Sequence, residues 1–203
     1  TQARMIEENK LLAELPMLSD LQCSWLLLLF CAEPRANHLL RTLPPTLSRH
    51  YAQAHDDALW QCLQTLLGET DDENFPAQYP RARDIASLPA HMGGLGLRSA
   101  TLHAPAAYWA GWADALFMLA QRQPVEAQRI TQNLMIGGAS QAACLSEASA
   151  AGRLLVEEGF SWIPPWQILL NGERSPPPDD NVNEPGMWNH GWQYYASLYL
   201  SLI

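Results

Sequence analysis

The sequence predicts a mostly α-helical protein, an irregular helical bundle with a Gly-rich turn and at most short strands. Apolar residues recur at three- and four-residue spacing along several segments, which is the pattern of helices with one buried face. No segment sustains the apolar–polar alternation that indicates a half-buried strand. Proline and glycine fall between the periodic segments, where helices are expected to begin and end.

Two helices are predicted at the start of the chain. The first spans residues 2–15 and ends at Pro16, because proline cannot continue a regular helix. A second, buried helix spans residues 20–31. Ser19 and Gln22 have the spacing of a capping box, in which both side chains satisfy backbone N–H groups at a helix start. The capping box therefore predicts that the second helix begins beside Ser19.

Two more helices follow. Pro34 opens a short helix that runs to Arg41, because the N–H that proline lacks would have no partner in a first turn. The prolines at 44–45 end it. The apolar spacing over residues 48–67 predicts a long helix, with Gly68 as its C-cap.

Further helices are predicted in the second half of the chain. They share the helical apolar spacing and cover residues 105–121, 124–135, 140–158, 164–170 and 187–203. Arg98 and Ser99, after the Gly-rich turn, are expected to open a helix that restarts at Pro105 as the first of these. Gly159 caps the helix that ends at residue 158.

Composition shifts divide the chain into five stretches. We expect a helical subdomain over residues 1–68 and an acidic linker over residues 69–84. A second helical subdomain, opened by the Gly-rich turn, is expected over residues 85–170. A Pro-rich acidic loop over residues 171–186 and an aromatic helix over residues 187–203 follow it. The chain begins with Thr1 rather than Met and ends on an apolar run. We therefore expect a fragment of a longer protein, with the last helix truncated.

The bulk composition limits the function classes. Hydrophobic residues make up 48% of the 203 residues and charged residues 16%, which argues against disorder. The net charge of −9 counts against an independent nucleic-acid binder, since such proteins are usually basic. Two basic stretches, 35–50 and 81–98, soften that argument, although we favour the interpretation that their arginines cap helices and solvate a surface.

Cysteine usage and hydropathy indicate the compartment. None of the four Cys forms a CxxC pair, and no signal peptide opens the chain, so we expect free thiols and an intracellular protein, cytoplasmic or nuclear. The longest apolar run, residues 25–32, is too short to cross a bilayer, so no membrane association is expected. The sequence does not indicate an oligomeric state.

No motif assembles a catalytic or metal-binding site. The run at 55–57, His-Asp-Asp, lies within a predicted helix, where adjacent side chains diverge, so we interpret it as a solvated helix face. The acids at 71–73 lack the ligand spacing of a calcium loop. We therefore expect no catalytic residue, no metal ligand and no cofactor in this chain.

Gly93, Gly94 and Gly96 form the most distinctive local motif. Their spacing matches neither the dinucleotide-binding nor the P-loop pattern, and Pro89 interrupts the segment where a strand would precede a phosphate loop. Glycine permits positive φ and close backbone approach. We favour a structural turn over a phosphate site.

Two stretches of the chain resemble a known family. Residues 88–100 (LPAHMGGLGLRSA) with 104–116, and the upstream run 25–45, are similar to the helical region that follows the polymerase core in reverse-transcriptase-like proteins of non-LTR retrotransposons. The resemblance covers residues 21–116, about half of the chain. Shorter runs near residues 157–160, 166–167 and 190–193 resemble extensions in protist members.

The resemblance implies a thumb or post-thumb region. In that family such a region packs behind the catalytic palm and helps hold the template–primer duplex, while the catalytic carboxylates and their divalent metal lie in the palm, upstream. No aromatic-Ala-Asp-Asp turn occurs here, so polymerase activity is not carried over to this chain. The resemblance implies a thumb-like subdomain at 1–68, and basic and polar residues of both stretches become candidate nucleic-acid contacts: Arg35, Asn37, His38, Arg41, Arg81, Arg83 and Arg98.

Two functions remain open on the sequence. One is a non-catalytic helical fragment that supports template–primer placement in the full-length protein, with an RNA or DNA duplex and the missing palm as partners. The alternative is a helical protein–protein interaction module without a nucleic-acid role. Its candidate anchors are the aromatic residues of the last segment, because aromatic side chains dominate binding energy at interfaces: Trp188, Trp192, Tyr194 and Tyr195.

Overall fold

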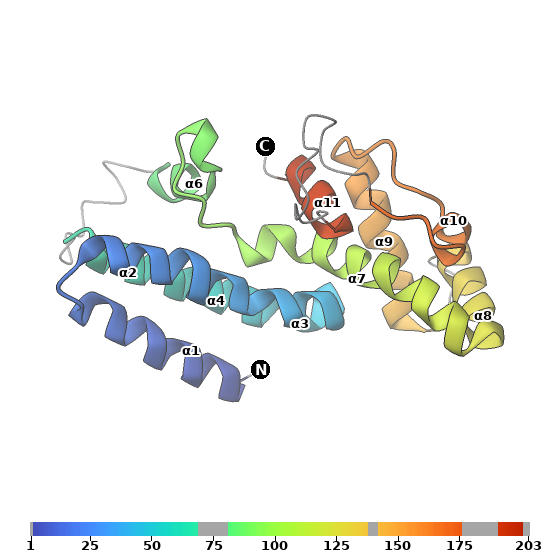
Figure 1. Cartoon of the computed structure of the whole chain (residues 1–203), viewed down its shortest axis with the longest axis horizontal. Coiled ribbons are helices and arrows are strands. Elements are labelled where there is room, and N and C mark those ends of the chain that lie inside the picture. Colours follow the sequence, from blue (N-terminus) through green and yellow to red (C-terminus); the bar gives the residue numbers. More distant parts are fainter. Residues whose placement is uncertain (1, 69–80, 138–141, 176–190, 201–203) are drawn as a thin grey trace, which may run out of the picture. The chain divides into compact units, whose positions relative to one another are not determined.

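The part of the chain that the structure describes consists mainly of helices (Figure 1). The computed structural model describes residues 2–68, 81–137, 142–175 and 191–200. None of these residues lies in a strand, so the predicted mostly α fold is confirmed. Among the same residues, no helix combines the length and the apolar character that crossing a bilayer requires.

The contacts divide the chain into two compact units. Unit 1 comprises Thr1–His38 and Ser48–Leu102, and unit 2 comprises Leu39–Leu47 and His103–Ile203. The α-helices are α1 (Gln2–Glu14), α2 (Leu21–Leu27), α3 (Asn37–Thr42), α4 (Pro45–Leu66), α6 (Ala82–Ser87), α7 (Ala100–Arg122), α8 (Pro124–Ile136), α9 (Ala143–Glu157), α10 (Trp166–Leu170) and α11 (Trp192–Leu200). Unit boundaries therefore fall within α3 and α4 and near the start of α7.

Unit 1 is built around α1, α2, α4 and α6. Three 3-10 segments, η1 (Leu15–Met17), η3 (Glu33–Ala36) and η4 (Ala90–Met92), and a π-helical segment, η2 (Leu28–Ala32), connect or extend these helices. The unit has its own apolar core, which includes Leu12, Leu28, Leu59, Leu63 and Leu97.

The second helix starts one residue later than the capping box indicates. Asp20, not Ser19, is its N-cap, because the Asp20 carboxylate accepts hydrogen bonds from the backbone N–H groups of Gln22 and Cys23. Asp is among the best N-cap residues, and its extended backbone places the carboxylate over these free donors.

The Gly-rich turn reverses the chain against the end of α6. Gly93 and Gly96 have φ values of 84° and 75°, which favour glycine. A Cβ at Gly94 would overlap the carbonyl oxygen of Leu88. The turn brings Leu97 beside α6, where its N–H donates to the carbonyl of Ala86. Both side chains enter the unit 1 core.

These contacts place α6 and the Gly-rich turn in unit 1, whereas the sequence assigned residues 85–102 to the next subdomain. The reason is tertiary: Ala86 and Leu97 pack in the same core as Leu59 and Leu63 of α4. Most of the predicted acidic linker, residues 69–80, lies outside the described residues, as do 176–190 of the loop and last helix.

Unit 2 packs α8, α9 and α11 around an aromatic centre on α7. The indole of Trp109 makes edge-on contacts with Phe160 and Trp192, with ring centroids 5.8 Å apart in each pair. Gly152 lets α9 approach Trp109 closely, since a Cβ there would lie 3.2 Å from the indole. Helix α7 begins at Ala100, directly after the predicted opening at Arg98 and Ser99, and it includes Pro105, so the predicted restart at Pro105 is wrong.

Residues 39–47 join unit 2 through polar contacts as well as packing. Arg41 forms an ion pair of 2.7 Å with Asp114 and donates to the Gln193 side chain at 3.1 Å. The side chain of Thr46 donates to Glu147 at 2.6 Å. These contacts explain why a short piece of α3 and the first turn of α4 belong to this unit.

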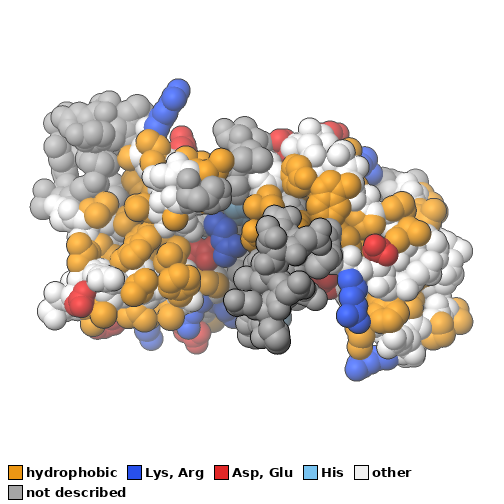
Figure 2. All heavy atoms as spheres, turned by 45° about the horizontal axis from the view of Figure 1, so that its top comes forward, with side chains coloured by type: hydrophobic (Ala, Val, Ile, Leu, Met, Phe, Trp, Pro, Cys, Tyr) orange, Lys and Arg blue, Asp and Glu red, His pale blue; other side chains and the backbone are white. Residues whose placement is uncertain are grey.

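Side chains on the surface of unit 1 include many apolar ones. Figure 2 shows them gathered over the first helices of this unit. The exposed apolar residues of η1, α2 and their neighbours are Met17, Leu18, Leu21, Leu26, Leu27 and Phe30. Phe30 is 67% exposed, which is high for a large aromatic residue.

Candidate functional site

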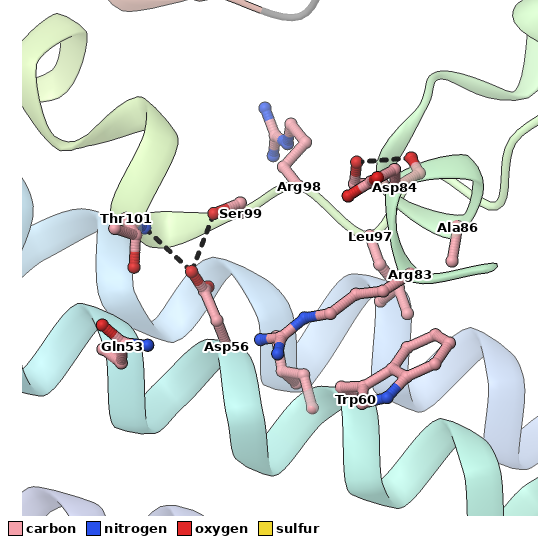
Figure 3. Close-up of a pocket in the computed structure, with 12 residues that line it drawn as sticks. Gln53, Asp56, Trp60, Arg83, Asp84, Ala86, Leu97, Arg98, Ser99 and Thr101 are labelled. Atoms are coloured by element: carbon pink, nitrogen blue, oxygen red, sulfur yellow. Dashed lines mark hydrogen bonds between the residues drawn. The ribbon is translucent and has the colours of Figure 1, made fainter. Parts of the chain in front are cut away.

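A cavity of about 250 Å³ lies in unit 1 between α4, α6 and the segment that leads into α7 (Figure 3). Its wall is mixed in character, with an aromatic ring, two guanidinium groups, two carboxylates and several small polar groups. The aromatic, charged and polar residues that line it include Gln53, Asp56, Trp60, Arg83, Asp84, Arg98 and Thr101.

Helix α4 supplies one wall of the cavity. Gln53, Asp56 and Trp60 are spaced by three and four residues, so they share one face of the helix. Asp56 is buried, Trp60 is half-buried and Gln53 is exposed. The face therefore runs from the core of the unit to solvent, with the indole and the amide available to a ligand.

Asp56 fixes the start of α7. Its Oδ1 accepts a hydrogen bond from the N–H of Ala100 at 2.6 Å, and its Oδ2 accepts from Ser99 Oγ at 2.8 Å and the N–H of Thr101 at 3.0 Å. Carboxylates are favoured at helix N-termini, where free N–H groups and the helix dipole meet them. Asp56 thus holds the rim of the cavity against α4.

Two arginines reach the cavity from different elements. Arg83 of α6 pairs with Asp57 at 2.8 Å, and both side chains are about half exposed. Arg98 donates from Nε and Nη2 to the Glu33 carboxylate at 3.1 and 3.3 Å. Burial raises the pKa of Glu33, and the neighbouring Arg98 opposes that shift. Each guanidinium keeps N–H groups that no described residue accepts.

Asp84 gives the cavity an acidic rim. It lies in the first turn of α6, is exposed, and has no basic partner among the described residues. The charges that line the cavity are therefore balanced, with Arg83 and Arg98 opposed by Asp56 and Asp84. Both carboxylate oxygens of Asp56 accept hydrogen bonds from residues 99–101 at the start of α7. Asp84 is therefore the carboxylate that an incoming ligand would meet.

A buried polar network lies behind this wall. Glu8 of α1 accepts from the Tyr51 hydroxyl at 2.6 Å and lies 3.0 Å from Nδ1 of His55, while Nε2 of His55 lies 3.2 Å from the backbone oxygen of Glu33. Burial alone would raise the pKa of Glu8, but the hydrogen bonds from His55 and Tyr51 outweigh it and lower that pKa. The network joins α1, η3 and α4.

The interpretation of residues 55–57 as a solvated face is wrong for two of the three residues. His55 and Asp56 are buried, and each has a polar partner on another element. Asp57 alone is exposed and faces Arg83. Helical spacing showed that these side chains diverge, but it could not show that α1 and α7 would cover two of them.

The sequence candidates for nucleic-acid contact are only partly brought together. Arg83 and Arg98 line one cavity, and Arg81 is the N-cap residue of α6. Arg41 is paired with Asp114 in unit 2. The other three, Arg35, Asn37 and His38, lie in η3 and at the start of α3. The contact role of all seven stays a prediction.

Trp60, Gln53 and Thr101 line the cavity but were not predicted as site residues from the sequence. Gln53 lies three residues before Asp56 on α4, and Trp60 lies four residues after it. This spacing could have grouped Gln53, Asp56 and Trp60 on one helix face. Nothing local in the sequence places Thr101 beside them, because that depends on how Asp56 docks the start of α7.

The aromatic anchors expected in the last segment have different surroundings. Trp188 lies outside the described residues. Trp192 is 3% exposed and packs against Trp109 inside unit 2, so the expectation that it anchors a partner is corrected. Tyr195 packs at the edge of the same core, and Tyr194 is 42% exposed. Trp192 therefore fills space in the apolar core of unit 2.

Metal-binding geometry is absent from the described part of the chain, where no three His, Cys, Asp or Glu side chains are grouped to hold an ion. The four cysteines are free thiols there, and burial raises the pKa of Cys62 to about 11.

Comparison with known proteins gives one informative similarity. The chain is 31% identical over 152 residues, 73% of its length, to the "Retrotransposable element SLACS 132 kDa protein" of Trypanosoma brucei gambiense. It spans about 12% of that relative's length. No family model matches the chain. No solved structure matches it either. The chain is therefore related to a retrotransposable-element protein.

Proposed function

We propose that this chain is a non-catalytic helical segment of a retroelement protein, of the thumb or post-thumb kind, that helps place a template–primer duplex in the full-length protein. The similarity to a retrotransposable-element protein over 73% of the chain supports the retroelement assignment. Residues 25–45 and 88–116, which resemble the region after the polymerase core of non-LTR elements, support the position within it. Catalysis and its divalent metal are assigned to a palm outside this chain.

The observation that carries the nucleic-acid role is that two arginines from different elements, Arg83 and Arg98, line one cavity. In Figure 3 the Arg83 side chain extends toward α4, whereas the Arg98 side chain points away from it. Arginine is well suited to phosphate, because its planar fork can donate two parallel hydrogen bonds. The Arg83–Asp57 pair is half exposed, and such pairs contribute only about 0–1 kcal/mol, so a phosphate can compete with Asp57. Phosphate contacts of this kind position a duplex without reading its sequence.

The net charge of −9 sets the conditions for a test. Long-range repulsion from the whole chain opposes a polyanion and grows as the salt concentration falls, whereas arginine–phosphate contacts, which release counterions, strengthen at low salt. Binding by the chain alone is therefore measured over a salt series. In the full-length protein other segments would supply most of the attraction, and the arginines of this segment would fix the register of the duplex.

The test is binding of a labelled RNA–DNA duplex to the full chain over a series of salt concentrations that starts at low salt, followed by fluorescence anisotropy. We expect Arg83→Ala to weaken binding severalfold and to reduce the slope of log K against log salt by about one, as for the loss of one phosphate contact. Arg129→Ala is the matched control, because Arg129 is also an exposed helical arginine paired with an acid, Glu126, but lies in unit 2. Equal effects of both substitutions, or no binding by the unaltered chain, contradict the proposal.

A protein–protein interaction module remains the second candidate function. The observation that favours it is the group of exposed apolar side chains around α2 and η2, among them Leu26, Leu27 and Phe30. Contiguous exposed apolar surface commonly marks a site of protein association. This candidate does not depend on the aromatic residues of the last helix.

A further inference from the structure

We propose that the cavity beside Trp60 binds a single unpaired nucleotide, the single-stranded continuation of the duplex. This inference rests on the proposed nucleic-acid role and goes beyond it, because it assigns a site and a strand state. The cavity of about 250 Å³ is smaller than the about 300–1,000 Å³ that ligand pockets usually measure, so it admits one base rather than a longer stretch of strand. A base-paired duplex is too wide to enter it.

Trp60 supplies the surface for the base. Its indole lines the cavity and is half-buried, so packing holds the ring in place while part of it stays accessible. Aromatic side chains bind unpaired bases by stacking, which any base can do because each has a π-face. Paired bases are already stacked on their neighbours, so this contact selects a single strand.

Arg83 supplies the contact to the phosphate. In Figure 3 its side chain extends from α6 toward α4, on the side of the cavity where Trp60 lies. Its ion pair with Asp57 leaves several guanidinium N–H groups unused among the described residues. A base on the indole and a phosphate on the guanidinium would therefore be held by adjacent groups of one wall.

Polar groups at the rim complete the site. Gln53 offers an exposed amide, which can donate and accept, and Thr101 offers an exposed hydroxyl. These groups suit a base edge or a sugar hydroxyl. Asp84, in contrast, repels a phosphate, so it is expected to limit the affinity of the site.

The experiment compares a blunt duplex with the same duplex carrying a short single-stranded overhang, in RNA and DNA versions, with the full chain at low salt. We expect the overhang to bind severalfold more tightly than the blunt end. Trp60→Leu should remove about tenfold of affinity and abolish the preference for the overhang, whereas Trp60→Phe, which keeps an aromatic face, should retain most of it. Thermal unfolding of both variants checks that unit 1 is folded.

A third variant keeps the test decisive if Trp60→Leu fails to fold. Asp84 is exposed and outside the core, so Asp84→Asn leaves packing unchanged and removes the repulsive charge. We expect it to strengthen overhang binding severalfold, more than it strengthens binding of the blunt duplex.

The outcomes separate this inference from the proposed function. Blunt and overhang duplexes that bind equally, both sensitive to Arg83→Ala, overturn the nucleotide site and leave the duplex role standing. No binding of either overturns both. Binding of a lysine-rich peptide that Asp84→Asn weakens would make the cavity a site for cationic side chains and overturn the inference.

Discussion

At the scale of single residues, Glu8 is the most consequential ionisable group in unit 1. It is 2% exposed, and burying an ion without partners would be costly. Tyr51 and His55 both meet its carboxylate, and Arg4 of the same helix lies 3.4 Å from Oε1. The Tyr51 hydroxyl donates to that carboxylate, which together with burial raises the pKa of Tyr51. The ionised form of Glu8 is thus built into the packing of α1 against α4.

The lowered pKa of Glu8 makes a prediction about acid stability. A carboxyl whose pKa is lower in the folded state stabilises the protein above its unfolded pKa, and this stabilisation is lost as the pH falls through the folded value. We expect Glu8→Gln to lower the free energy of unfolding by about 2–4 kcal/mol at pH 7, because it breaks a buried charged network. The difference from the unaltered chain should shrink below about pH 4.5.

Urea unfolding of both proteins across pH 3–7 measures this difference (the pH range follows the ordinary Glu pKa of about 4.3). Comparison of the two proteins isolates Glu8, since Glu33, whose pKa burial raises, contributes to both with the opposite sign. A difference that stays constant with pH would show that Glu8 acts through packing alone.

At the scale of elements, the start of α7 depends on a residue of another helix. The first N–H groups of a helix have no partner within it, and Asp56 of α4 accepts from two of them. Ser99 adds a local cap, because its Oγ accepts from the N–H of Leu102. The Gly-rich turn delivers the chain to this position with Leu97 already in the core. Docking of this segment on α4 and capping of the α7 N-terminus thus depend on the same residue, Asp56.

Neighbouring aspartates on α4 allow a matched test of this docking. We expect Asp56→Ala to destabilise the protein by about 1–3 kcal/mol, because buried N–H groups lose their acceptor. Asp57→Ala should cost less than about 1 kcal/mol, since it removes only a half-exposed ion pair with Arg83. Thermal unfolding followed by circular dichroism compares the two. Similar losses for both variants would argue against a special role of Asp56.

At the scale of the whole molecule, two separate apolar cores and an excess of negative charge coexist. Leu59 and Leu63 lie in the core of unit 1, and Trp109 and Phe160 in that of unit 2. The charge of −9 favours solubility and disfavours close association of copies. The exposed apolar residues around α2 and η2, in contrast, favour association with another protein surface.

If the chain is a protein–protein interaction module, we expect apolar association to outweigh charge repulsion at physiological salt, where that repulsion is screened beyond about 8 Å. On that candidate, the mass of the full chain measured by light scattering should rise with concentration, and Phe30→Ser should remove the rise. Val125→Ser is the control, because Val125 is 78% exposed but lies in unit 2. A constant monomer mass in all three proteins would count against self-association through this surface.

The positions of the helices along the chain follow mainly from the local sequence. Apolar spacing, proline and glycine placed most helices within a few residues of their observed bounds, because helical hydrogen bonds connect residues four apart. Gly93 and Gly96 were recognisable as a turn for the same local reason, namely that their positive φ suits glycine.

Tertiary structure decided everything that depends on contacts between distant segments. Asp56 and His55 became buried because α7 and α1 pack on α4. Trp60 lines one cavity with Arg83 and Arg98 because the Gly-rich turn folds α6 onto the same core. Trp192 became an internal residue because it fills space beside Trp109. Periodicity reveals which face of a helix is apolar, but the choice of partner for each face is set by shape and polar pairing across the core.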